Sequence, residues 1–189
     1  MNERPAPVDV EVPEDIRRIW EENGTPIVKI PDPVLRQVAS PVAKPTSEIR
    51  DLVEGMKAAM RGAHGVGLAA PQMGVPLRLF IYQLPEENAP LRVVLNPRIV
   101  QAKGEQVGPE GCLSIPMLQG DVKRAFEITL KGQDMLGRPF KRRATEFEAR
   151  VIQHEYDHLE GILFTDRADP ETLHWLLPDE AAEEQDVIG

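Results

Sequence analysis

The sequence has a single cysteine and no long apolar run. Cys112 is the only cysteine among 189 residues, so an internal disulfide is excluded. A lone cysteine fits a reducing compartment, where it serves as a core residue, a nucleophile or a metal ligand. No stretch approaches the length of a membrane-spanning helix, and the N-terminus lacks the apolar core of a signal peptide. These absences predict a soluble cytoplasmic protein without a membrane partner.

Basic residues are also in the minority. The 22 lysines and arginines are outnumbered by 31 acidic residues, which gives a formal net charge of −9. Nucleic acids and anionic membranes are both recognised by clustered cations, so this balance predicts no direct nucleic-acid binding. A local basic run, Lys141-Arg142-Arg143, is interpreted as a solvated strand end, with RNA contact as the alternative. The length, with 41% hydrophobic residues, predicts one globular domain.

The most informative stretch is His-Glu-x-x-His at His154, Glu155 and His158. Two imidazoles four residues apart on a helix face the same side, so both can reach one metal ion. The glutamate between them is placed to move protons for a water that the metal activates. Phe147 and Val151 fall in the same stripe as the histidines at helical spacing. We therefore predict a buried metal-binding helix, rather than a core helix that carries two histidines by coincidence.

Helix signals and strand signals predict the rest of the chain. This helix is expected to open with a capping box of Thr145 and Glu148 and to end at Gly161. Further helices are expected at residues 13–23, 47–62 and 170–176, strands at 77–83, 92–96, 99–103, 126–131 and 138–143, and turns at 64–72 and 108–116. The strands are clustered rather than alternating with helices. This order predicts an α+β domain, with antiparallel sheets packed around the central metal-binding helix.

A catalytic metal usually has a third protein ligand and an open position. The longer motif His-x-x-Gly-x-x-His fails here, because Phe164 stands where its third histidine belongs. A downstream carboxylate, Asp179 or Glu180, would complete the site of a zinc endopeptidase. Cys112 is the other candidate, since a thiolate is a strong ligand for Zn²⁺ or Fe²⁺. The residues by themselves leave these two readings open.

Three stretches make the chain similar to the peptide deformylases. They occur in the family's order and are Gly65-Val66-Gly67-Leu68-Ala69-Ala70-Pro71-Gln72, Glu110-Gly111-Cys112-Leu113-Ser114 and Gln153-His154-Glu155-Tyr156-Asp157-His158-Leu159. The resemblance implies removal of the N-formyl group from the formyl-methionine of newly synthesised polypeptides, with release of formate. It also implies a catalytic domain at residues 26–177, between an N-terminal extension, 1–25, and an acidic C-terminal tail, 178–189.

The resemblance implies a role for each matching residue. The implied metal ligands are Cys112, His154 and His158. They would hold one divalent ion, Fe²⁺ by the resemblance, and the same ligand set accepts Zn²⁺, Ni²⁺ or Co²⁺. Glu155 would act as general base and then as general acid. The Gln72 side-chain amide and the Leu113 backbone N–H would stabilise the oxyanion.

Substrate contacts follow from the same resemblance. The implied residues are Val66, Gly67, Glu110, Gly111, Arg124, Phe147 and Val151. Backbone groups of Val66, Gly67 and Gly111 would pair with an extended peptide, and apolar side chains would enclose its methionine. The chain departs from the family's pattern in two places. Gln119 stands where the family often has arginine, and the acidic tail differs from the basic C-terminal helix with which some members reach the ribosome. We therefore predict a transient contact with the ribosome and specify no mode of docking. A binding module without catalysis is the remaining alternative, which the complete set of site residues disfavours.

Overall fold

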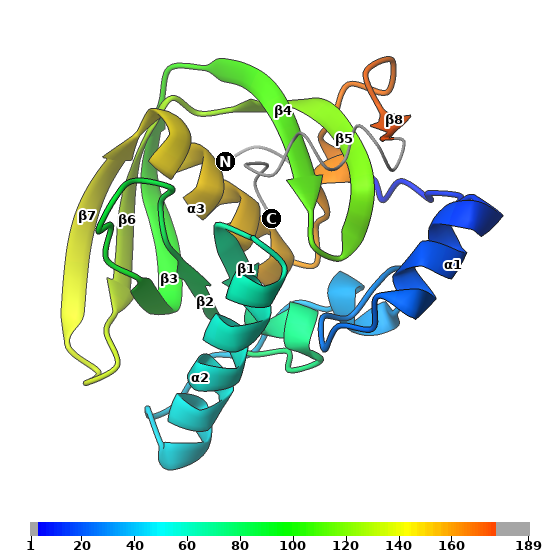
Figure 1. Ribbon diagram of the computed structural model, residues 1–189. Helices are drawn as coiled ribbons and strands as arrows, with labels where there is room; N and C mark the ends of the chain where they lie inside the picture. Colours follow the sequence, from blue (N-terminus) through cyan, green and yellow to red (C-terminus); the bar gives the residue numbers. More distant parts are fainter. Residues whose placement is uncertain (1–3, 177–189) are drawn as a thin grey trace.

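A computed structural model of the chain describes residues 4–176 and places two antiparallel sheets on either side of one helix (Figure 1). This central helix is α3 (Glu146–Leu159), which carries both histidines of the His-Glu-x-x-His stretch. The prediction of an α+β domain built around a metal-binding helix is confirmed. None of the helices in this described part has the length and apolar character needed to cross a membrane.

The larger sheet has five strands in the order β1-β2-β3-β6-β7. The strands are β1 (Gly67–Ala69), β2 (Leu79–Tyr82), β3 (Arg92–Lys103), β6 (Glu127–Gln133) and β7 (Pro139–Thr145). Side chains alternate between its faces: Ile128 and Leu130 are buried in the cluster that includes α3, whereas Lys131 is exposed. The strands predicted in this region are confirmed, except that 92–96 and 99–103 form one strand interrupted by bulges. The turn predicted at 64–72 is wrong, because β1 begins there.

The smaller sheet has three strands in the order β4-β5-β8. They are β4 (Gln106–Cys112), β5 (Ile115–Arg124) and β8 (His174–Trp175). The turn predicted at 108–116 is therefore wrong, because these residues belong to a hairpin of β4 and β5. Pro109 is tolerated there because β4 is an edge strand. The helix predicted at 170–176 is also wrong, since Trp175 pairs with Leu118 of β5. In both cases strand pairing between distant residues outweighs the local turn and helix signals.

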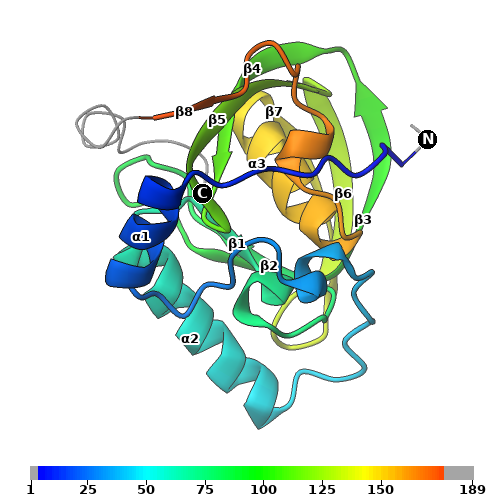
Figure 2. The ribbon, with the colours of Figure 1, turned by 90° about the vertical axis from the view of Figure 1, so that its right-hand side faces the viewer.

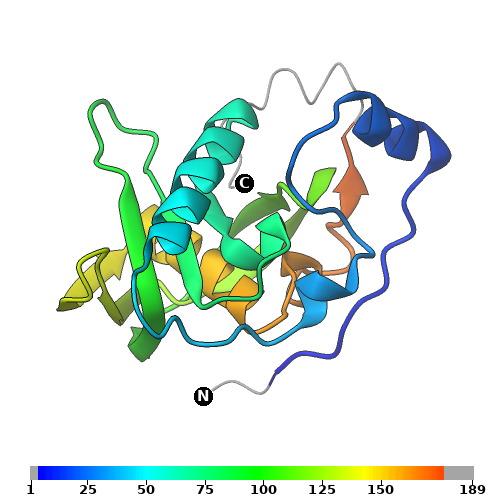
Figure 3. The same ribbon diagram turned by 90° about the horizontal axis from the view of Figure 1, so that it is seen from below.

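The remaining helices lie outside this sandwich. They are α1 (Glu14–Glu22) and α2 (Ser47–Gly62), with short 3-10 turns at η1 (Pro33–Arg36), η2 (Ala70–Met73) and η3 (Phe164–Asp166). Figure 3 shows α2 running beneath the larger sheet, where its apolar face contributes to a second buried cluster. Both long helices match their predicted positions to within a residue or two.

The two ends of α3 differ from each other. The predicted capping box is wrong, because the Thr145 side chain makes no cap hydrogen bond. Glu148 instead accepts hydrogen bonds from Tyr82 Oη and Arg142 Nε, each at 2.8 Å. At the other end Gly161 has φ +67°, as predicted for a residue that follows a helix. A Cβ atom there would also lie 2.4 Å from the Arg36 carbonyl oxygen, so glycine is required for space as well as for conformation.

The N-terminal segment packs on the rest of the molecule. Figure 2 shows it crossing in front of α3 before it enters α1. Val8 N–H donates to Asp166 Oδ1 at 2.8 Å, and Trp20 Nε1 donates to the Pro116 carbonyl oxygen at 3.2 Å. The Trp20 ring also lies against Trp175, with 6.1 Å between centroids. The segment thus contacts both η3 and the β4–β5 hairpin.

Candidate metal centre

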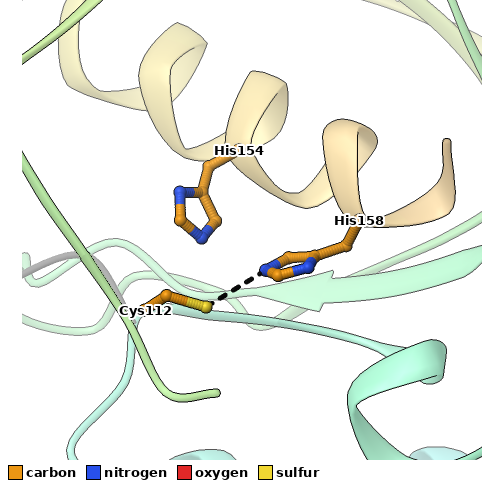
Figure 4. A group of neighbouring side chains, drawn as sticks. All are labelled: Cys112, His154 and His158. Carbon is orange, nitrogen blue, oxygen red and sulfur yellow. Dashed lines mark hydrogen bonds between the residues drawn. The ribbon is translucent and has the colours of Figure 1, made fainter. Parts of the chain in front are cut away.

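Three buried side chains from two elements converge beside α3 (Figure 4). Cys112 ends β4, while His154 and His158 lie one turn apart on α3, which places both rings over the thiol. The Sγ atom of Cys112 lies 3.3 Å from His158 Nε2, and the three ligand atoms lie within 4.8 Å of one another. One sulfur and two imidazole nitrogens at this spacing form a donor set suited to a transition-metal ion.

The protonation of these groups supports the same conclusion. His154 Nε2 is buried without a hydrogen-bond partner, a costly arrangement that a bound metal ion would resolve. Burial holds the pKa of His158 well below its usual value, so the ring stays neutral, which is the form that binds a metal. Burial also raises the pKa of the Cys112 thiol to about 12 in the metal-free chain, so an ion must displace its proton. The residues present therefore fit a divalent ion.

A buried carboxylate fixes the orientation of His154. Glu110 Oε2 lies 2.9 Å from His154 Nδ1 and accepts a hydrogen bond from the Nδ1–H group, which leaves Nε2 as the ligand nitrogen. Glu110 also accepts from Arg124 at 2.9 and 2.8 Å and from Arg150 at 2.9 Å. Burial alone would raise the pKa of Glu110, but Arg124 and His154 hold it well below its usual value. Glu110 therefore stays ionised at neutral pH, directly behind one metal ligand.

Arg124 connects this carboxylate to a second one. Its side chain is 3% exposed, and its guanidinium also donates to Asp157, whose carboxylate accepts from Arg167 at 2.7 and 2.8 Å. Glu110 and Arg124 were expected among the substrate contacts, but the structure places both in this buried network behind the ligands. Sequence reasoning missed Arg150 and Arg167 altogether. Arg150 was detectable, because it is an arginine four residues before His154 on a helix predicted to be buried.

Glu155 lies next to the metal ligands, and its carboxylate makes no hydrogen bond within the described residues. Both of its carboxylate oxygens are buried without a hydrogen-bond partner. A Cβ atom at Gly67 would lie only 2.3 Å from Glu155 Oε1, so the carboxylate rests directly against the backbone of β1. Burial, and then the charge of Glu110, raise the pKa of Glu155 well above its usual value. A carboxyl group with a raised pKa is suited to taking a proton and passing it on.

The predicted oxyanion donors also reach this place. Gln72 is fully buried on η2, where its Oε1 accepts from the Ala69 N–H at 2.8 Å. Its Nε2 group points at Ser114 Oγ at 3.2 Å and at Cys112 Sγ at 3.6 Å. Leu113 follows Cys112 in the hairpin turn. The three stretches that are far apart in the sequence therefore meet at one centre.

The apolar residues expected around the substrate gather in one cluster. Val66 and Val151 are buried members of it, and Phe147 packs against it while partly exposed. Gly67 starts β1, which lies at the edge of the larger sheet with an unpaired side, and Gly111 lies between Glu110 and Cys112 on β4. The other two histidines, His64 and His174, are exposed and take no part in this centre. The proposed endopeptidase ligands, Asp179 and Glu180, fall outside the described residues.

Fold and site together define a metal-binding hydrolase centre: a Cys-His-His ligand set with a buried carboxylate beside it. The model of the polypeptide deformylase family matches residues 25–174. A peptide deformylase from Thermomicrobium roseum is 44% identical over 158 residues, which cover 80% of this chain and 90% of that protein. This chain belongs to the polypeptide deformylase family.

Solved structures of the family have the same fold. A peptide deformylase from Legionella pneumophila is similar with a TM-score of 0.74 and 38% identity, covering 85% of this chain and 92% of that one. A class I type b peptide deformylase from Acinetobacter baumannii, solved with Met-Ala-Ser bound, gives 0.72 and 34%, covering 76% and 97%. Each match spans most of both chains, so the fold is shared over most of their length.

Proposed function

We propose that this chain hydrolyses the N-formyl group of formyl-methionyl peptides, giving formate and a free amino terminus. The observation that carries the proposal is the convergence of Cys112, His154 and His158 with Glu155 beside them. When bound to these ligands, a divalent ion supplies a Lewis acid that activates water and polarises the formyl oxygen. The Met-Ala-Ser peptide bound by the Acinetobacter relative supports a product that begins with methionine.

Glu155 acts as the proton carrier in this proposal. Its free carboxylate oxygens and raised pKa suit a group that accepts a proton from the attacking water. The same carboxyl group then donates that proton to the leaving amine. Because Gly67 has no side chain, the Glu155 carboxylate can lie directly against the backbone of β1, where it is fully buried. Both steps therefore take place in a site from which bulk water is excluded.

Charge that develops on the formyl oxygen needs hydrogen-bond donors. The Gln72 amide is held by its bond to Ala69, which aims its Nε2 group toward the Cys112 side of the site. The Leu113 N–H is the second proposed donor. Losing one such donor typically reduces kcat by about 10²–10³. Gln72 is thus proposed as a catalytic residue rather than only a link between η2 and the hairpin.

The peptide is proposed to bind along the free edge of β1. Backbone groups of Val66, Gly67 and Gly111 would add it as a further strand. Its methionine side chain would enter the cluster that contains Val66, Phe147 and Val151. We do not place Glu110 and Arg124 against the peptide, because their polar groups are already engaged behind His154.

We further propose Fe²⁺ as the native ion, since the ligand set is softened by one thiolate and also accepts Zn²⁺, Ni²⁺ or Co²⁺. Residues 26–177 would act as the catalytic unit, with residues 1–25 as an extension and residues 178–189, which lie outside the described residues, as an acidic tail. A substrate that appears during translation supports a cytoplasmic location and a transient contact with the ribosome.

The deciding experiment measures formate release from a formyl-methionyl tripeptide by anaerobically Fe²⁺-loaded protein. Glu155→Gln is the matched control, because it keeps the side-chain shape and the metal ligands. Formate from the parent and a loss of at least about 10³-fold in the variant are expected. No formate from protein that carries one ion per chain would refute the proposal and favour the endopeptidase or the binding module. A Cys112→Ala variant separates these, since only the endopeptidase would retain its ion.

A further inference from the structure

The outer face of the larger sheet is basic, although the chain as a whole is acidic. Its cations stand on β3, β6 and β7, and we call them the basic face: Arg98, Lys103, Lys131, Lys141 and Arg143. All five are exposed, and Glu127 is the single acidic residue whose strand position lies among them. The opposite face of these strands packs toward α3. A local charge of about +4 therefore faces solvent on a chain whose net charge is −9.

Strand register places three of these cations in one row. Lys141 lies opposite Lys131, and Lys131 lies opposite Arg98. Cβ atoms of directly opposed residues are roughly 5 Å apart, a distance at which like charges destabilise a sheet. Within residues 4–176 the structure gives none of the three an ion-pair partner, whereas neighbouring arginines at 138, 142 and 143 each have one. The row therefore lacks internal compensation, and its three charges are available to an external anion.

Two shallow depressions of the surface are lined in part by members of this row. One, of about 480 Å³, is lined by Gln101, Lys103, Glu127, Thr129, Lys141 and Arg143. The other, of about 390 Å³, is lined by Pro41, Arg78, Asn96, Arg98, Lys131, Gly132 and Gln133. The polar side chains beside the cations are largely paired with one another: Thr129 Oγ1 donates to Gln101 Oε1, and Asn96 Nδ2 donates to Gln133 Oε1. The cations are therefore the groups that this surface offers to phosphate oxygens. A membrane-binding face would instead present large apolar side chains for insertion, and neither depression has them.

We propose that the basic face binds the phosphate backbone of RNA. Antiparallel strands offer a row of cations and hydrogen-bonding groups but no deep pocket, which suits a repeated backbone better than a small ligand. The acidic remainder of the chain would be repelled by RNA, so binding is confined to this face. Figure 1 shows α3 between these strands and the hairpin that carries Cys112, so the basic face points away from the metal centre.

If the chain is a deformylase, as proposed above, this orientation suits an enzyme that works beside the ribosome. Formylated chains emerge from the ribosome, whose surface is rich in RNA. An enzyme held there by its outer sheet would keep its substrate edge, on β1 at the other end of the sheet order, free for the peptide. Deformylation of a free peptide in solution should not depend on the basic face.

The test measures binding of the full, metal-loaded chain to a fluorescent 16-base-pair RNA duplex at low salt. Lys131→Glu with Lys141→Glu removes two cations of the row. Arg17→Glu with Arg18→Glu is the matched control, because these exposed arginines of α1 give the same change in net charge. We expect the row variant to bind at least about 10-fold more weakly and the control to change by less than about 3-fold.

Salt dependence supplies a second readout. Three phosphate contacts predict a log–log slope of affinity against salt of about −2.7, and the row variant should lower its magnitude to about 1. Equal losses in both variants, no binding by the parent chain, or equally tight binding to anionic phospholipid vesicles would each overturn the proposal. Lys131→Gln with Lys141→Gln, expected to give an intermediate loss, replaces the glutamate pair if that pair does not fold. A chain that binds RNA through this row but releases no formate refutes only the proposed function.

Discussion

Replacing Glu110 by glutamine should loosen the bound metal ion without touching a ligand. The substitution keeps the shape of the side chain but removes the negative charge of the carboxylate, whose Oε2 accepts a hydrogen bond from His154 Nδ1–H at 2.9 Å. Changes of this kind typically weaken metal binding by about 10–100-fold, or about 1.4–2.8 kcal/mol. The fold is affected as well, because Arg124 and Arg150 each lose a buried partner. Breaking a buried ion pair costs about 3–5 kcal/mol, and the retained Asp157 contact places this change at the lower end.

Asp157→Asn separates the two effects. It removes a carboxylate from the same network, where it faces Arg124 and Arg167, but it makes no contact with His154 in the described structure. Both variants should therefore lose stability in urea unfolding, while only Glu110→Gln should release its ion faster. The assay follows transfer of the metal to a coloured chelator. If the two variants release the ion at the same rate, the effect is general loosening of the fold and the reasoning fails.

The same carboxylate predicts a pH dependence. The folded-state pKa of Glu110 is depressed, so its ionised form stabilises the folded chain above the unfolded pKa of about 4.3. That contribution is lost as pH falls toward the folded pKa. The difference in unfolding free energy between the parent and Glu110→Gln should therefore be largest near neutral pH. It should shrink steadily below about pH 4, and a constant difference would contradict the assignment.

Three further substitutions and one removal test other parts of the structure. Gly67→Ala places a Cβ atom 2.3 Å from Glu155 Oε1, so it should lower formate release by at least about 10-fold with little change in metal content. Gly161→Ala combines φ +67° with a contact of 2.4 Å to the Arg36 carbonyl and should lower unfolding free energy by about 2–4 kcal/mol. Gly55→Ala, in open space on α2, should instead raise it by about 0.5–1 kcal/mol. Chelation of the ion should lower the melting temperature, because a ligand that binds only the folded chain stabilises it.

The site was more predictable from the sequence than its framework. His154 and His158 repeat at the spacing of a helix turn, and a contiguous stripe needs no distant partner to be recognised. The β4–β5 hairpin was missed because Gly108, Pro109 and Gly111 are turn residues in most settings. Here they are tolerated on an edge strand paired with β5, a contact that no local signal encodes. The network around Glu110 was missed for the same reason, since its partners come from β5, α3 and the segment after η3.

The net charge likewise does not reveal how charges are distributed over the folded surface. A total of −9 excludes a nucleic-acid surface only if acidic and basic residues are mixed over the whole molecule. Alternation along a strand instead sorts neighbours onto opposite sides: Lys141 and Arg143 face outward, whereas Arg142 turns to Glu148 of α3. Register then adds Lys131 from β6 to the outward set. A charge pattern on a sheet is thus a property of paired strands, so it becomes visible only when their partners and register are known.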